Sequence, residues 1–160
     1  MCTTILSTKK LKTMTETPAT TVDDCRIINL EHHPHSYGTL TVAQNSNALP
    51  FAIKRIYYIY DIPTNSTRGG HSHFTEQCIL TAVGGCFDVS VFDGKNKKTF
   101  TLKRPFEGLY IPPGIWRTME NFSSGCIVLV LSSIKFDEKD YVRDMDHFTE
   151  LKQNTFDKHL

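Results

Sequence analysis

Short apolar runs separated by turn-forming residues dominate this chain from about residue 55 onward, and they limit the folds open to it. The runs cover residues 55–62, 77–85, 86–94, 97–105, 108–114 and 125–133. Gly, Pro, Asn and Asp fall between them, and Asp93-Gly94 is a strong tight-turn signal joining two of the runs. No helical period separates the runs, so we expect an all-β domain, an antiparallel sandwich or barrel.

The first run, RIYYIYDI, alternates and so has two distinct faces as a strand. Residues two apart in a strand share a face, so Arg55, Tyr57, Ile59 and Asp61 lie together and the intervening residues face the other way. A barrel of this size can hold one small ligand in its mouth.

The two ends of the chain differ from this central part. Residues 1–24 are Thr-rich and lack apolar periodicity, which predicts a disordered N-terminal tail. The expected domain covers residues 25–148, and residues 149–160 are a C-terminal tail or the end of a helix. The charged stretch 136–153 is predicted to form one or two short helices that close over the barrel.

Charge and cysteine content exclude some partners and favour one compartment. Lys and Arg number 18 against 17 for Asp and Glu, so nucleic acid and an anionic membrane are not expected partners, whereas a small anionic ligand stays possible. No apolar run approaches the ~18 residues of a membrane span. The five cysteines form no CxxC pair, which favours reduced thiols and a cytoplasmic protein.

The stretch RGGHSHFTEQ, residues 68–77, carries the first chemical signal. Strand alternation places His71, His73 and Gln77 on one face and turns Glu76 away. The spacing resembles the first motif of the cupin superfamily, G-x5-H-x-H-x3-E-x6-G, with Gln77 in the glutamate position and Gly84 as the closing glycine. Asn65 stands where the leading glycine would be.

Residues 112–121, PPGIWRTMEN, resemble the second cupin motif, P-x-G-x2-H-x3-N, with Arg117 in the histidine position. The two motifs together indicate a cupin fold, a double-stranded β-helix or jelly-roll barrel with short C-terminal helices. Two of the usual metal ligands are replaced by a neutral amide and a permanent cation, so no bound metal is expected. The histidines are then either proton-transfer groups or simply hydrogen-bonded barrel residues.

A longer set of residues resembles the WxcM-like sugar 3,4-ketoisomerases, a branch of the cupins. The resemblance rests on IKRIYYIYD (53–61), RGGHSH (68–73), residues 108–133 and the pattern D-x-x-D-Y-x-R within residues 136–148. It implies conversion of dTDP-4-keto-6-deoxy-D-glucose to a dTDP-3-keto-6-deoxyhexose through an enediol(ate), without a cofactor. The product would feed 3-amino-3,6-dideoxy sugars for surface polysaccharides.

The same resemblance implies roles for individual residues. His71 would be the main base and His73 would assist the proton shuttle. Tyr57 would contact the sugar oxygens, and Arg68 would stabilise the enediolate or hold the diphosphate. Five further side chains are expected to contact the substrate: Arg55, Gln77, Tyr110, Trp116 and Arg117. The two arginines among them suit the diphosphate, and the tryptophan either stacks on thymine or packs at the end of the barrel.

Members of this family are dimers that exchange an N-terminal strand, so we expect residues 37–42 to pair with a second copy. Three other functions stay open: a sugar-nucleotide 3,5-epimerase, a non-catalytic sugar-binding cupin and a metal-dependent oxygenase. The pairing of RGGHSH with NFSSG disfavours the epimerase, and Gln77 and Arg117 disfavour the oxygenase.

Overall fold

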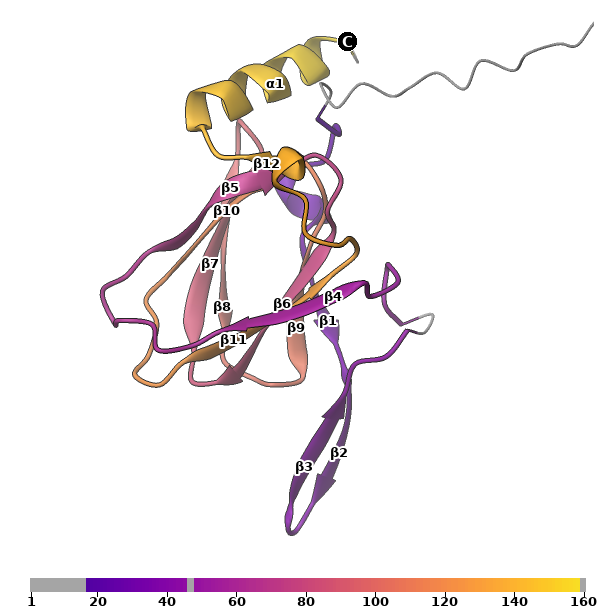
Figure 1. Ribbon diagram of the computed structural model, residues 1–160, viewed down its shortest axis with the longest axis vertical. Helices are drawn as coiled ribbons and strands as arrows, with labels where there is room; N and C mark the ends of the chain where they lie inside the picture. The colour runs from indigo at the N-terminus through magenta and orange to yellow at the C-terminus, as the bar shows by residue number, and fades with distance from the viewer. Residues whose placement is uncertain (1–16, 46–47, 159–160) are drawn as a thin grey trace, which may run out of the picture.

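A computed structural model describes residues 17–45 and 48–158, and two antiparallel sheets form its body (Figure 1). The first sheet has the strand order β1 (Arg26–Asn29), β9 (Glu107–Ile111), β6 (Cys78–Gly84), β11 (Ile127–Ser132) and β4 (Arg55–Ile59). The second has the order β12 (Tyr141–Val142), β5 (Arg68–His73), β10 (Trp116–Glu120), β7 (Phe87–Phe92) and β8 (Lys97–Leu102). The predicted all-β cupin barrel is confirmed.

The main hydrophobic core fills the space between the two sheets. Its fully buried members include Phe87, Val89, Leu102, Leu109 and Val128. Inward and outward residues alternate along β4 as predicted, because Tyr57 and Ile59 pack against this core while Ile56 and Tyr58 are exposed. The turn predicted at Asp93-Gly94 joins β7 to β8, and the Asp93 carboxylate accepts from the backbone N–H groups of the turn.

A hairpin of β2 (Glu31–His35) and β3 (Gly38–Val42) extends from the body at the end opposite the C-terminal helix (Figure 1). Every residue of β2 is exposed, and Tyr37, at the turn, has 94% of its surface open to solvent. An isolated two-stranded hairpin is marginally stable in water, so this element is one that a further contact would stabilise.

The segments at the other end of the barrel close it. Helix α1 (Met145–Asp157) begins before the expected boundary at residue 148. The short 3-10 turn η2 (Glu138–Asp140) lies just before it in the chain, and a second 3-10 turn, η1 (Val22–Asp24), lies near the N-terminus. Residues 17–24, predicted to belong to the disordered tail, instead pack on the barrel: Thr20 Oγ1 donates to the Pro113 carbonyl over 2.5 Å. Residues 1–16 lie outside the described part of the chain. No helix in the described ranges has the length and apolar character needed to cross a membrane.

Candidate active site

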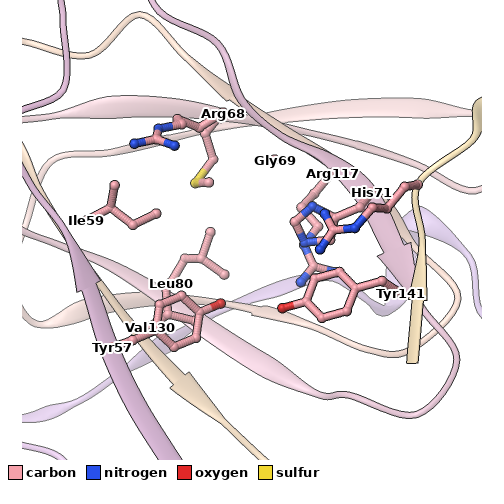
Figure 2. A pocket seen from close by; sticks show the side chains of 11 residues that line it. Tyr57, Ile59, Arg68, Gly69, His71, Leu80, Arg117, Val130 and Tyr141 are labelled. Atoms are coloured by element: carbon pink, nitrogen blue, oxygen red, sulfur yellow. The ribbon is translucent and has the colours of Figure 1, made fainter. Parts of the chain in front are cut away.

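A pocket of about 270 Å³ opens between the two sheets, a size that suits one small ligand. Its polar lining consists of Tyr57, Arg68, His71, Arg117, Tyr141 and Arg143. The rest of the lining is apolar and consists of Ile59, Gly69, Leu80, Met119 and Val130. Figure 2 shows Tyr57 and Tyr141 pointing toward one another, with His71 and Arg117 close together beside Tyr141. The structure therefore brings four of the predicted site residues into one cavity: Tyr57, Arg68, His71 and Arg117.

The pairing of β5 with β10 places His71 and Arg117 side by side, because these two residues are direct partners in the sheet. The register shifts immediately after Arg117, where Thr118 lies opposite Gly69. Gly69 has φ +86°, and a Cβ there would lie 2.8 Å from the Arg117 carbonyl oxygen. Gly69 of RGGHSH thus allows the close strand approach beside Arg117.

Burial and the neighbouring cation keep the His71 imidazole neutral. Burial, the charge of Arg117 and the proximity of His73 lower its pKa to about 3, so it carries a free lone pair at neutral pH. Burial likewise raises the pKa of the Tyr57 hydroxyl, which stays protonated. The pocket therefore contains an uncharged imidazole and an uncharged phenol beside fixed guanidinium cations, a combination able to accept a proton and to stabilise a developing oxyanion.

His73 lies behind the pocket lining and has only 1% of its surface exposed. Its ring is edge-on to His71, with 5.0 Å between ring centroids, and 4.1 Å from the ring of Tyr141. Burial and the charge of Arg117 lower its pKa to about 4. The two motif histidines are neighbours as predicted, but in this structure only His71 reaches the cavity surface.

Glu76, not Gln77, points toward the histidines, which corrects the prediction from strand alternation. Strand β5 ends at His73, and the Asp140 carboxylate accepts hydrogen bonds from the backbone N–H groups of Thr75 and Glu76. The chain turns there, so the two-residue period that placed Gln77 inward does not extend past the strand. The Glu76 side chain is buried, and its Oε2 lies 3.4 Å from His73 Nδ1.

Four of the five predicted substrate contacts do not line this pocket. Arg55 forms an ion pair with Glu76 over 3.0 Å and stacks on the Tyr57 ring, so it supports the pocket from behind. Tyr110 donates to Gln77 Oε1 over 2.8 Å. Tyr110 belongs to a hydrophobic cluster with Leu30, Leu49, Ile79 and Leu131, distinct from the cluster between the sheets.

Trp116, the fourth of these residues, packs against helix α1 and does not face the pocket. It belongs to a cluster with Val142 and Phe148, and its ring centroid lies 5.5 Å from that of Phe148. Neighbouring residues of β10 point to opposite sides, so the inward position of Arg117 requires the outward position of Trp116.

Sequence reasoning assigned no role to four side chains that the structure places at the site. Tyr141 and Arg143 line the cavity, and the carboxylates of Asp140 and Glu76 lie 3.0 Å and 3.4 Å from His73 Nδ1. Three of the four belong to the D-x-x-D-Y-x-R pattern of residues 137–143, so that pattern was the available signal.

His73, Glu76 and Asp140 form a group of potential metal ligands, since their ligand atoms lie within 4.8 Å of one another. However, the Arg55 guanidinium already donates a hydrogen bond to Glu76 Oε2, and its positive charge would repel a metal ion bound there.

Comparison with known proteins places this site in a family. A family sequence model described as FdtA, WxcM-like, C-terminal, matches residues 23–153. TDP-4-oxo-6-deoxy-alpha-D-glucose-3,4-oxoisomerase from Aneurinibacillus thermoaerophilus is 37% identical over 123 residues, which cover 77% of this chain and 88% of that protein.

Solved structures agree with this assignment. The 3,4-ketoisomerase QdtA from Thermoanaerobacterium thermosaccharolyticum, solved as a mutant with TDP-4-keto-6-deoxyglucose, is 34% identical with a TM-score of 0.80 and covers 82% of this chain and 96% of its own. A TDP-quinovose 3,4-ketoisomerase from Campylobacter jejuni is 40% identical with a TM-score of 0.75, covering 79% and 98%. The chain is an isomerase and belongs to the WxcM-like family of sugar 3,4-ketoisomerases.

Proposed function

We propose that this chain converts dTDP-4-keto-6-deoxy-D-glucose into a dTDP-3-keto-6-deoxyhexose. The observation that carries the proposal is the neutral His71 imidazole in a small pocket, directly beside the Arg117 guanidinium and facing Tyr57 and Tyr141. A relative and a solved neighbour that act on or bind TDP-4-keto-6-deoxyglucose support the choice of substrate.

The residues account for each proton in the reaction. His71 removes the proton from C3, which the adjacent C4 ketone makes acidic, and the electron pair moves to the C4 oxygen to give an enediolate. The His71 imidazolium returns a proton to C4, and the C3 hydroxyl proton moves to the C4 oxygen, which gives the C3 ketone and restores the neutral base. Tyr57 is placed to exchange the hydroxyl proton, and His73, next to His71, assists the transfer. The reaction is neutral in electrons and needs no redox cofactor.

The arginines stabilise the anionic species and hold the diphosphate. Arg117 is buried beside His71 and faces the enediolate in this arrangement. Arg68 and Arg143 are exposed at the pocket and suit the diphosphate, because a guanidinium matches phosphate oxygens with two parallel hydrogen bonds. The same fixed charges disfavour a divalent cation in this pocket, which supports a metal-independent reaction.

The test is incubation of the purified protein with dTDP-4-keto-6-deoxyglucose in D2O, followed by NMR of the sugar protons. We expect a 3-keto product with deuterium at C4, formed at the same rate after treatment with a chelator. Absence of both signals, with and without added metal, would contradict the isomerase proposal. Deuterium incorporation accompanied only by inversion at C3 and C5 would instead indicate a 3,5-epimerase.

We also propose a homodimer in which the β2–β3 hairpin contributes a strand to a second copy. The hairpin extends from the body, and its exposed Leu40 and Tyr37 would be covered by such a contact (Figure 1). Multi-angle light scattering of the intact protein and of a variant lacking residues 31–42 tests this: the intact protein should have the mass of two chains and the variant that of one.

We place the enzyme in the cytoplasm, where the unpaired thiols of Cys25, Cys78, Cys86 and Cys126 would stay reduced.

A further inference from the structure

Asp140 lies at the centre of a buried hydrogen-bond network behind the pocket. Its Oδ1 accepts from the backbone N–H of Thr75 over 2.8 Å and from the Thr75 hydroxyl over 2.6 Å. Its Oδ2 accepts from the backbone N–H of Glu76 over 3.0 Å and lies 3.0 Å from Nδ1 of His73. Asp140 itself has 1% of its surface exposed.

This arrangement determines which ring nitrogen of His73 carries the proton. Burial opposes ionisation of Asp140, but its hydrogen bonds with His73 and Thr75 outweigh burial and lower its pKa, so the side chain is a carboxylate that only accepts hydrogen bonds at neutral pH. The close contact with His73 is then a hydrogen bond only if Nδ1 carries the hydrogen. Glu76 does not compete for it, because its Oε2 is farther away, at 3.4 Å, and accepts from Arg55 over 3.0 Å.

The other nitrogen of the ring keeps its lone pair as a result. A neutral imidazole carries one hydrogen, so Nε2 is an acceptor when Nδ1 is the donor. His73 Nε2 has no hydrogen-bond partner among the described residues. Its ring contacts His71 and Tyr141, both of which line the pocket.

We propose that Asp140 is a positioning residue for the isomerisation, fixing the His73 imidazole with its proton on Nδ1 and thus leaving Nε2 able to accept a proton. This inference rests on the proposed function, in which His73 assists proton transfer beside His71. Asp140 contributes by orienting the ring and by stabilising the imidazolium that forms when Nε2 takes up a proton. It does not itself contact the substrate.

Asp140→Asn is the informative substitution because an amide cannot reproduce this network. If the Asn oxygen replaces Oδ1 to serve Thr75, the NH2 group points at Nδ1 of His73 and donates to it, which moves the ring proton to Nε2. If the amide is flipped, the NH2 group meets two donors of Thr75. The matched control is Asp137→Asn, at the other end of the same 3-10 turn, where an exposed carboxylate caps Lys139 N and asparagine is an equally good cap.

Long-range 1H–15N NMR of the histidine rings reads the tautomer directly, and turnover is followed in parallel. We expect Nδ1–H for His73 in the wild-type protein and in Asp137→Asn, and Nε2–H in Asp140→Asn. The kcat of Asp140→Asn should fall by roughly 10²-fold, the lower end of what a general acid–base group contributes, with KM changed less than about threefold. Asp137→Asn should match the wild type in both constants.

Each other outcome overturns the inference. A wild-type His73 with its proton on Nε2 contradicts it, and this measurement needs no variant if Asp140→Asn fails to fold. An Asp140→Asn protein with an unchanged tautomer, or with a moved proton and an unchanged kcat, contradicts it as well. All of these results leave wild-type turnover intact, whereas failure of the proposed function appears as a wild-type protein that neither exchanges deuterium nor forms a 3-keto sugar.

Discussion

Two buried charged side chains, Asp140 and Lys152, hold distant parts of this chain together in different ways. Asp140 has 1% of its surface exposed and Lys152 has 0%. Lys152, on helix α1, donates from Nζ to the carbonyl oxygens of Pro18 over 2.9 Å and Thr20 over 2.6 Å, and so holds the N-terminal segment against the barrel. Asp140 accepts from backbone groups in a similar manner, but one of its partners is the titratable ring of His73.

The comparison shows that burial of a charge does not by itself indicate a catalytic role. Lys152 meets only backbone carbonyl oxygens through its hydrogen bonds, and it lies away from the pocket that contains His71. Asp140 is connected to that pocket through His73 and its ring contact with His71. We therefore assign Lys152 to stability and Asp140 to the chemistry, and four predictions test that division.

The largest effect should follow substitution of His71 by asparagine. This variant keeps a polar side chain of similar shape but has no group that can act as the C3 base, so kcat should fall by about 10³-fold or more. Stopped-assay NMR of the 3-keto product measures the rate, and titration calorimetry with TDP should show binding within a few-fold of the wild type. A variant with full activity would show that the base has been assigned to the wrong residue.

Lys152→Met should show the opposite pattern, with lower stability and normal turnover. The substitution leaves two carbonyl oxygens without their donor, which should lower the free energy of unfolding by about 2–3 kcal/mol. Urea unfolding measures this loss, and the exposed Lys103→Met provides the control. A kcat that fell in proportion to the stability loss, measured well below the unfolding transition, would remove the distinction drawn between Lys152 and Asp140.

The free energy of unfolding should rise with pH in two separate windows, one caused by His71 and His73 and the other by Lys152. The folded-state pKa of His73 is about 4 and that of His71 about 3, against the ordinary histidine value of 6.5, so the unfolded chain takes up protons first as the pH falls below 6.5. The stability present above that pH is therefore lost progressively toward pH 4. The pKa of Lys152 is lowered by burial to about 8 from 10.5, so unfolded chains also hold more protons between pH 8 and 10.5.

Urea unfolding at a series of pH values separates these contributions. Each group can add a slope of up to about 1.4 kcal/mol per pH unit within its window. We expect His71→Asn to reduce the slope below pH 6.5 only, and Lys152→Met to reduce it above pH 8 only. Equal slopes in the wild type and both variants would mean that these groups titrate alike in the folded and unfolded chains.

The smallest effect should come from Trp116→Phe, on the outer side of β10. The indole packs on Phe148 of α1, so the smaller ring should lower the free energy of unfolding by about 1 kcal/mol and leave KM within twofold of the wild type. Arg117→Lys, at the adjacent inward position, should instead change kcat and KM with little effect on stability. A large increase in KM for Trp116→Phe would revive the prediction that this side chain stacks on thymine.

The sequence predicts the fold well because the fold depends on local patterns. Turn residues at short intervals indicate the strands, and alternation along β4 correctly places Tyr57 and Ile59 on the same face. The error at Gln77 arose because the chain direction after β5 is set by Asp140, which lies 64 positions from Glu76. Tyr141 and Arg143 were missed for the same reason: no local period reveals that a strand of two residues pairs with β5.

The pairing of β12 with β5 has a consequence for the order in which this enzyme becomes active during synthesis. The strands β1 to β11 leave the ribosome before residues 138–143, and domains fold as the chain emerges from its N-terminal side. Until the later segment docks, His73 lacks the Asp140 carboxylate at Nδ1 and the pocket lacks Tyr141. A nascent barrel therefore lacks part of the proposed active site, and the last short strand to join it completes both the hydrogen-bond network around His73 and the cavity.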